Sequence, residues 1–332
     1  MKGIYIIAEA GVNHNGSLKL AKQMVQEAKK AGADAVKFQT FQAGNLVTKY
    51  AEKAKYQKES AAFPESQYQM LRSLELTYDD FLEIKALCDL ENIEFLSTPF
   101  DLESIELLES VGLACYKIPS GAITDYPYLK RIAKTHKPVI LSTGMSTIDE
   151  IEDALLILQT YGTTAVTLLH CNTQYPAPVA DVNLTAMCTL RNRFHVDIGY
   201  SDHTQGMEVA IAAVAMGAKV IEKHFTLDKS MKGPDHKASM DVNELTAMIM
   251  AIRNVERALG DGQKKPSPSE MENISAIRKS IVAKRDIQKG ELLKEDNLTT
   301  KRPGTGLSPM LWNEIIGTEA IKNFSEDQMI EI

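Results

Sequence analysis

The stretch VILSTGMSTIDEIEDALLILQTYGTTAVTLLH, residues 139–170, contains one complete strand–helix–strand unit. Two short apolar runs, Val139–Ser142 and Val166–His170, have the length of buried strands. Between them, Ile148–Leu158 has the spacing of an amphipathic helix, which a Thr-x-x-Glu capping box opens at Thr147. Because strands joined by a helix normally run parallel, this stretch predicts one unit of a parallel α/β sheet.

The same alternation recurs over the first 225 residues. Six further apolar runs are predicted strands: Ile4–Ala8, Ala35–Phe38, Glu94–Ser97, Cys115–Ile118, Asp197–Ser201 and Val220–Phe225. Helical patterns between strands include Leu18–Ala31 and Tyr78–Leu90. Eight such units in about 260 residues predict a (β/α)8 TIM barrel over residues 1–258 rather than an open doubly wound sheet. The gap from 39 to 93 is too long for one helix and predicts an inserted excursion over the barrel mouth.

The composition changes from Leu259 onward. Gly260–Ser269 is rich in Gly, Pro, Ser and Lys and has no periodicity, so we predict a linker over residues 259–277. Short β-like pieces separated by turns then follow, among them Ser280–Ala283 and Leu298–Lys301. Residues 278–332 therefore predict a separate β-rich module that needs support from a neighbour because it is so small.

Charge and composition exclude several classes of function. The 332 residues carry 37 basic and 44 acidic side chains, a net charge of −7. This balance argues against nucleic acid or an anionic membrane as the main partner, although a local basic pocket can still bind a small anion. The sequence contains no apolar run long enough to span a bilayer, and its apolar start is too short for a signal peptide. Four cysteines without CxxC spacing fit a reduced, cytoplasmic protein.

Polar side chains stand at the carboxyl ends of all eight predicted strands, where a barrel of this kind has its active site. Two lysines, Lys37 and Lys117, occur there together with the hydroxyls of Thr98, Ser120 and Ser142. Lysine supplies charge and hydroxyls supply directional donors, which suits a phosphate or a phosphate-carboxylate compound. The alternative is that these are solvated lysines at strand ends.

Two histidines, His203 and His224, end adjacent predicted strands, which lie roughly 4.8 Å apart in a sheet. Both imidazoles could ligate one divalent metal ion and leave positions open for water and a substrate oxygen. The alternative is a pair of hydrogen-bonded core histidines.

A set of short motifs follows the strands in order: Ile7–Gly16, Val36–Thr40, Phe95–Asp101, Tyr116–Gly121, Leu141–Met145, Gly199–His203, Ile221–Thr226 and Gly233–His236. In this order the set resembles the sialic acid synthase family over nearly the whole chain. In the tail, Arg278–Ile281, Ile287–Glu291 and Lys301–Gly304 resemble that family's C-terminal antifreeze-like (SAF) domain.

The family condenses phosphoenolpyruvate with an open-chain N-acylated mannosamine-type sugar to give a nine-carbon 2-keto acid and phosphate. The resemblance implies that phosphoenolpyruvate binds Lys37, Thr98, Lys117, Ser120, Ser142 and Ser201. It implies catalytic roles for Glu9, as acid or base, and for His203 and His224, which would hold Mn²⁺, or Mg²⁺ or Co²⁺, to polarise the aldehyde. The sugar end would be lined by Gln39, Asn172, Thr173, Tyr175, Asp235 and Arg302. Arg302 would come from the partner subunit of a domain-swapped homodimer.

One position departs from the family pattern. Ser120-Gly121-Ala122 has alanine where the family usually has a glutamate that acts near the sugar aldehyde. Alignment of Asn172 or Thr173 with the family's binding asparagine is ambiguous by one position.

The main interpretation is an N-acetylneuraminate synthase that uses N-acetylmannosamine. One alternative is an N,N'-diacetyllegionaminate synthase that uses the 2,4-diacetamido-2,4,6-trideoxymannose analogue. Others are a catalytically impaired sugar-binding homologue, and a related aldolase-type synthase for a different keto acid.

Overall fold

The computed structural model describes residues 3–48, 51 and 66–332. The chain forms two compact units that divide between Gly260 and Asp261. Within the described ranges, no helix combines the length and the apolar character that crossing a membrane requires.

The first unit is built on eight parallel strands in the spatial order β3-β2-β1-β8-β7-β6-β5-β4. The N-terminal strand pairs with β8, and β3 contacts β4 at the two ends of this order, so the sheet curves into a barrel. The predicted (β/α)8 barrel is confirmed. The strands are β1 (Tyr5–Gly11), β2 (Ala35–Thr40), β3 (Glu94–Pro99), β4 (Tyr116–Ile118), β5 (Val139–Ser142), β6 (Val166–Cys171), β7 (Asp197–Asp202) and β8 (Val220–His224).

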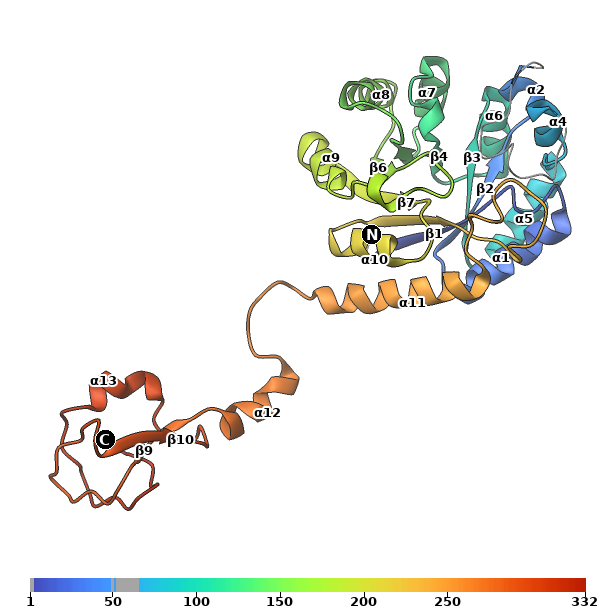
Figure 1. Cartoon of the computed structure of the whole chain (residues 1–332). Helices are drawn as coiled ribbons and strands as arrows, with labels where there is room; N and C mark the ends of the chain where they lie inside the picture. The colour runs from blue at the N-terminus through green and yellow to red at the C-terminus, as the bar shows by residue number, and fades with distance from the viewer. Residues whose placement is uncertain (1–2, 49–50, 52–65) are drawn as a thin grey trace. The chain divides into compact units, whose positions relative to one another are not determined.

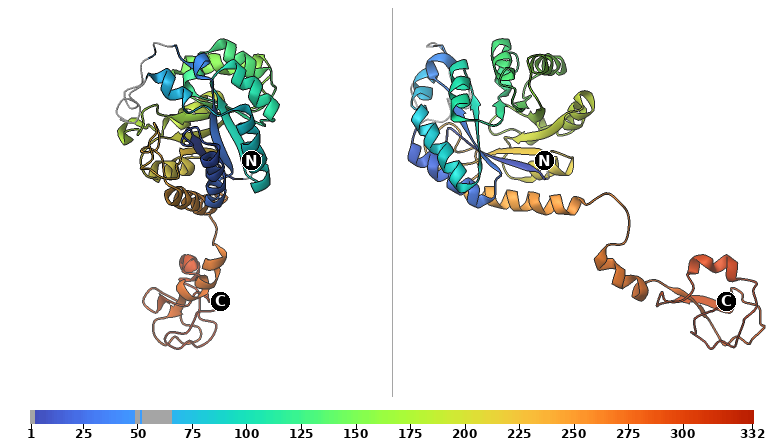
Figure 2. Two further views of the ribbon diagram at one scale, coloured as in Figure 1. Left: turned by 90° about the vertical axis from the view of Figure 1, so that its right-hand side faces the viewer. Right: turned by 180° about the vertical axis from the view of Figure 1, so that it is seen from behind.

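Helices cover the outer face of this sheet, as two further views also show (Figures 1 and 2). Helix α8 begins at the predicted capping box, in which Thr147 pairs with Glu150. The helices around the strands are α1 (Leu18–Ala31), α5 (Tyr78–Glu91), α6 (Leu102–Val111), α7 (Tyr126–Ala133), α8 (Ile148–Thr160), α9 (Ala186–Phe194), α10 (Glu208–Ala215) and α11 (Val242–Leu259).

Alternation along the strands places the polar site directly above an apolar plug inside the barrel. Ile7, Leu96, Ile140, Leu169 and Val220 form this inner core cluster. Two residues further along each strand, the inward position carries a polar or sulfur-bearing side chain, because side chains in a strand alternate between its faces. The apolar plug therefore forms the floor on which the strand-end side chains stand.

The predicted excursion between β2 and β3 contains α2 (Ala43–Leu46) and α4 (Gln67–Arg72) ahead of α5. Phe41, Met70 and Leu74 from this segment pack with Val12 in a small apolar cluster of their own. The rest of the excursion, residues 49–50 and 52–65, lies outside the described residues.

The second unit has a separate apolar core, which includes Ile281, Leu298 and Phe324. Its antiparallel strands are β9 (Ser280–Ala283) and β10 (Leu298–Lys301), and α13 (Trp312–Ile315) follows them. The predicted linker differs from the structure at its end, because α12 (Pro268–Ile277) is helical. Pro268 occupies the first turn, and the Glu270 carboxylate accepts a hydrogen bond from the Ser267 backbone N–H. Pro268 and the Glu270–Ser267 hydrogen bond thus favour a helix here. The linker was predicted because this stretch lacks a periodic apolar pattern, which these local features do not require.

Candidate active site

A cavity of about 340 Å³ opens at the carboxyl ends of the barrel strands. The structure brings the predicted site residues together around it, with two exceptions, Asn172 and Arg302. Arg302 belongs to the second unit. Asn172 is half-buried, and its Oδ1 accepts from the backbone N–H of Gln174 at 2.7 Å.

Both predicted lysines are buried in the wall of this cavity. Lys37 Nζ lies 2.5 Å from Glu9 Oε2 and donates to Thr98 Oγ1 at 3.1 Å. Lys117 Nζ donates to Ser142 Oγ at 2.7 Å. These contacts fix both ammonium groups and aim them at the same space.

Glu222 joins the two lysines, and the sequence analysis did not include it among the site residues. Its carboxylate lies 3.6 Å from Lys37 Nζ and 3.5 Å from Lys117 Nζ, and it accepts from Ser201 Oγ at 2.8 Å. The signal that could have identified it is alternation along β8, which puts Glu222 on the same face as His224, two residues later.

The two buried glutamates differ in their electrostatics. Burial alone would raise the pKa of Glu222, but Lys117 and Lys37 outweigh this effect and hold it below its usual range. Burial raises the pKa of Glu9, and Lys37 offsets that rise only in part. Glu222 is therefore a permanent counter-charge to the lysines, whereas Glu9 is suited to exchange a proton.

Strand pairing determines which site residues lie next to Glu9. Its partner in β2 is Lys37, and its partner in β8 is His224. Gln39, one inward position beyond Lys37, donates to Glu9 Oε1 at 3.3 Å. The β1 end thus places one carboxylate between the lysine group and the histidine pair.

The rings of His203 and His224 have centroids 5.5 Å apart. The Nδ1–H of His203 donates to the Asn172 carbonyl, so its Nε2 accepts, and the Tyr175 hydroxyl lies 3.0 Å from it. Burial lowers the pKa of His203 to about 4. Burial also lowers the pKa of His224, and the neighbouring His203 lowers it further. Both imidazoles are therefore neutral at pH 7.

These two histidines fit a divalent metal ion, judged by their chemistry. Among the described residues, the buried Nδ1 of His224 has no hydrogen-bond partner, and neutral imidazole nitrogens are good ligands. The described part of the chain contains no cluster of three or more His, Cys, Asp or Glu side chains around one point. The protein would therefore supply two ligands and leave the remaining positions to water and substrate.

Ser120 and Thr173 approach each other across Gly144, a residue with φ of +44°. A Cβ at Gly144 would lie 2.4 Å from Ser120 Oγ and 3.0 Å from Thr173 Cγ2, so only glycine fits there. Ala122, at the other end of the short turn Ser120–Ala122, packs against the barrel core and is not among the cavity-lining residues.

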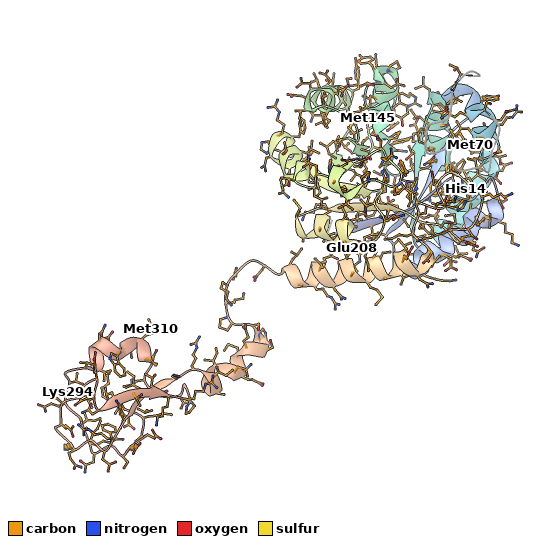
Figure 3. The ribbon with its side chains drawn as sticks, viewed as in Figure 1. His14, Met70, Met145, Glu208, Lys294 and Met310 are labelled. Carbon is orange, nitrogen blue, oxygen red and sulfur yellow. The ribbon has the colours of Figure 1, made fainter. Side chains whose placement is uncertain are left out.

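The far end of the cavity is largely apolar, with Gln67 of α4 as a polar exception, and this character was not predicted from the sequence. Val12, Phe41, Leu46, Met70, Leu71 and Phe100 line it, contributed largely by the segment that carries α2 and α4; Met70 is labelled in Figure 3. Asp235 also lines the cavity, and burial raises its pKa to about 6.

Comparison with known proteins agrees with this geometry. The chain matches the NeuB family over residues 24–264 and the SAF domain over residues 278–331. It is 54% identical over 332 residues to N,N'-diacetyllegionaminic acid synthase of Campylobacter jejuni, covering 99% of both chains. It is 48% identical to the protein of the same name from Legionella pneumophila, covering 97% of this chain and 91% of the relative.

A solved structure is also similar. The crystal structure of N-acetylneuraminic acid synthetase from Leptospira borgpetersenii, in complex with citrate, is 35% identical with a TM-score of 0.74. The match covers 82% of this chain and 90% of that one. The chain therefore belongs to the NeuB family, is an enzyme of the sialic acid synthase type, and carries an SAF domain after its barrel.

Proposed function

We propose that this enzyme is an N,N'-diacetyllegionaminic acid synthase that condenses phosphoenolpyruvate with 2,4-diacetamido-2,4,6-trideoxymannose and releases phosphate. From the sequence alone, N-acetylmannosamine is the main expected substrate and this sugar is the alternative. The relatives from Campylobacter jejuni and Legionella pneumophila support the alternative, because both carry this name and match nearly the whole chain.

The lysine end of the cavity suits phosphoenolpyruvate. Lys37 and Lys117 supply two positive charges, and hydroxyls of Thr98, Ser120, Ser142 and Ser201 surround them. Charge-assisted hydrogen bonds of this kind favour a phosphate and a carboxylate held close together. Burial lowers the pKa of Lys117 and Glu222 opposes that change, whereas the pKa of Lys37 is raised because Glu222 and Glu9 outweigh its burial.

The reaction forms a bond from C3 of phosphoenolpyruvate to the sugar aldehyde carbon, and the aldehyde oxygen takes up a proton. Water then adds at C2 and loses a proton, and the tetrahedral intermediate releases phosphate by C–O cleavage. Glu9 is the residue that moves these protons, because burial has brought its pKa above the usual range. Its place between Lys37 and His224 puts it next to both reactants.

A divalent ion, with Mn²⁺ as our first choice, would be held by His203 and His224 and would polarise the aldehyde as a Lewis acid. Tyr175 contacts both rings, with centroid distances of 4.0 Å to His203 and 5.5 Å to His224. It thereby orients the two imidazole rings.

The observation that carries the choice of sugar is the apolar far end of the cavity. Open-chain N-acetylmannosamine has hydroxyls at C4, C5 and C6, whereas the trideoxy analogue has a second acetamido group at C4 and a methyl group at C6. Phe41 and Leu71 can pack against these methyl groups, whereas their side chains offer no hydrogen-bond partner to a hydroxyl.

Phosphate release from phosphoenolpyruvate, measured with each sugar in turn, tests the proposal. We expect kcat/KM for the diacetamido-trideoxy sugar to exceed that for N-acetylmannosamine by at least about 10-fold, the usual discrimination of an apolar pocket. Equal or better turnover of N-acetylmannosamine would restore the original interpretation.

The homodimer, the cytoplasmic location and the role of Arg302 from the partner subunit are part of the same proposal. Arg302 lies next to Pro303 in the second unit. A guanidinium suits a carboxylate or an acetamido carbonyl at the sugar end.

A further inference from the structure

An ion pair lies on the outer face of the same two strands that carry the histidines. Asp202 and Lys223 are direct partners in the β7–β8 pairing, one register step beyond Ser201 and Glu222. Because Ser201 and Glu222 point into the cavity, Asp202 and Lys223 point the opposite way, toward the helix layer. Neither residue lines the active-site cavity.

The polar side-chain atoms of Asp202 and Lys223 all take part in the ion pair or in hydrogen bonds to Thr204. Lys223 Nζ lies 2.7 Å from Asp202 Oδ2 and also donates to the Thr204 carbonyl at 2.5 Å. Asp202 Oδ1 accepts from the Thr204 backbone N–H at 2.9 Å and from Thr204 Oγ1 at 2.8 Å. His203 is the residue between Asp202 and Thr204, so the network closes around its backbone.

The pair also reaches the second histidine, because His224 directly follows Lys223 in the chain. Both side chains are almost fully enclosed, with exposed fractions of 2% for Lys223 and 0% for Asp202. Burial lowers the pKa of Lys223, and Asp202 opposes that change. Two further carboxylates act on Lys223 from the helix layer: Glu208 of α10, labelled in Figure 3, and Glu244 of α11.

A buried ion pair is weak evidence for stability, since apolar residues of similar volume often replace it without loss. Its effect here is geometric. The network ties the backbone on both sides of His203 to the residue before His224, so one set of bonds fixes both strand ends relative to each other. Residues behind metal ligands commonly set ligand orientation in this way.

We propose that the Asp202–Lys223–Thr204 network is the positioning element that sets the separation of His203 and His224 and thereby their affinity for a divalent cation. None of its three members would touch the cation or the substrates. The proposal rests on the metal site inferred above.

The test measures Mn²⁺ binding to the full chain by titration, with free Mn²⁺ followed by electron paramagnetic resonance. The principal variant, Asp202→Asn/Lys223→Met, removes both charges together and keeps an amide oxygen as acceptor for Thr204. We expect its Mn²⁺ affinity to fall about 10- to 100-fold. At saturating Mn²⁺, kcat and the KM for phosphoenolpyruvate should stay within about threefold of wild type, because the reactive groups are untouched.

The control is Asp34→Asn/Arg253→Met, which removes an ion pair whose side chains are 37% and 33% exposed. That pair, with Nη2 and Oδ2 2.6 Å apart, ties α11 to the residue before β2 at the opposite end of the strands. It should leave Mn²⁺ affinity unchanged. If the principal variant does not fold, Thr204→Val replaces it, because this variant removes only one hydrogen-bond donor to Asp202. We expect Thr204→Val to lower the Mn²⁺ affinity about threefold and Thr204→Ser to restore it.

These variants distinguish failure of the metal site from failure of the positioning role. Mn²⁺ binding that persists in His203→Ala/His224→Ala would show the metal site itself to be wrong. If those histidines are needed, but the network variants bind Mn²⁺ as tightly as wild type, the positioning role is wrong and the metal site stands. An equal loss in the control pair would show a general effect of damage to the barrel and would also overturn the positioning role.

Discussion

The two ends of the active-site cavity come from different kinds of sequence. The phosphate end consists of single polar residues at successive strand ends, such as Lys37, Lys117 and Ser142, each held by its neighbours. The end proposed for the sugar combines polar residues such as Asp235 with apolar side chains from the segment between β2 and α5, such as Phe41 and Met70. The barrel fixes the first end, whereas an insertion supplies much of the second.

This difference indicates how one architecture can serve several sugars. The positions of the strand-end residues follow from parallel pairing, so changing any of them disturbs a shared network. The inserted segment has its own small core and can change with little effect on the barrel. We therefore expect substitutions at the phosphate end to abolish turnover and those at the sugar end to redirect it.

The largest effect is expected for Lys117→Met. The variant loses one of the two charges proposed to bind phosphate and leaves Glu222 with one cation instead of two. Removing one partner of a buried charge pair with a bound anion costs about 2–5 kcal/mol of binding free energy, so kcat/KM for phosphoenolpyruvate should fall about 10³-fold. Steady-state kinetics with phosphoenolpyruvate as the varied substrate measures the loss.

Lys85→Met provides the control, because Lys85 forms an exposed pair with Asp89 on α5 and should change kcat/KM little. A Lys117→Met enzyme with near-normal kinetics would mean that the buried lysines are structural.

The strand-end residues could be predicted from the sequence better than the residues of the inserted segment. The strand ends were predictable because apolar runs locate the strands and topology brings their ends together. Glu222 was missed because it stands between a hydrophobic residue and Lys223, and only alternation along β8 shows which face it occupies. The apolar end was missed because Phe41, Met70 and Leu71 belong to short helices and loops with no period that assigns a face.

A second comparison concerns carboxylates. Glu222 faces two lysines, whereas no described cation forms an ion pair with Asp235, whose pKa is raised to about 6 by burial alone. Its ordinary value is 3.8, so the folded state holds the proton more tightly than the unfolded state does. Stability is therefore lost as pH rises from about 4 to about 6, by about 3 kcal/mol in total.

Asp235→Asn removes that loss. We expect the variant to melt at a higher temperature than wild type at pH 8, and we expect this difference in melting temperature to be smaller at pH 4.5. A gain in stability at high pH is the opposite of what the loss of a carboxylate usually causes. Thermal unfolding at the two pH values measures this difference. An advantage that is equal at both pH values would mean that the charge of Asp235 is not the cause.

The smallest effect, and the sharpest test of the two-ended cavity, is expected for Leu71→Asn. Leu71 is half-buried at the apolar end, so the variant should fold and should lose contact with the methyl groups of the diacetamido-trideoxy sugar. An apolar contact of this size is worth about 1–3 kcal/mol, so kcat/KM for that sugar should fall about 10-fold. The KM for phosphoenolpyruvate should not change, because we propose that Lys37 and Lys117 bind that substrate at the other end. Leu90→Asn, at a leucine that is 81% exposed on α5, should alter neither value. A Leu71→Asn variant that weakens both substrates equally would mean that the two ends act as one site, and that the inserted segment shapes the whole cavity rather than the sugar end alone.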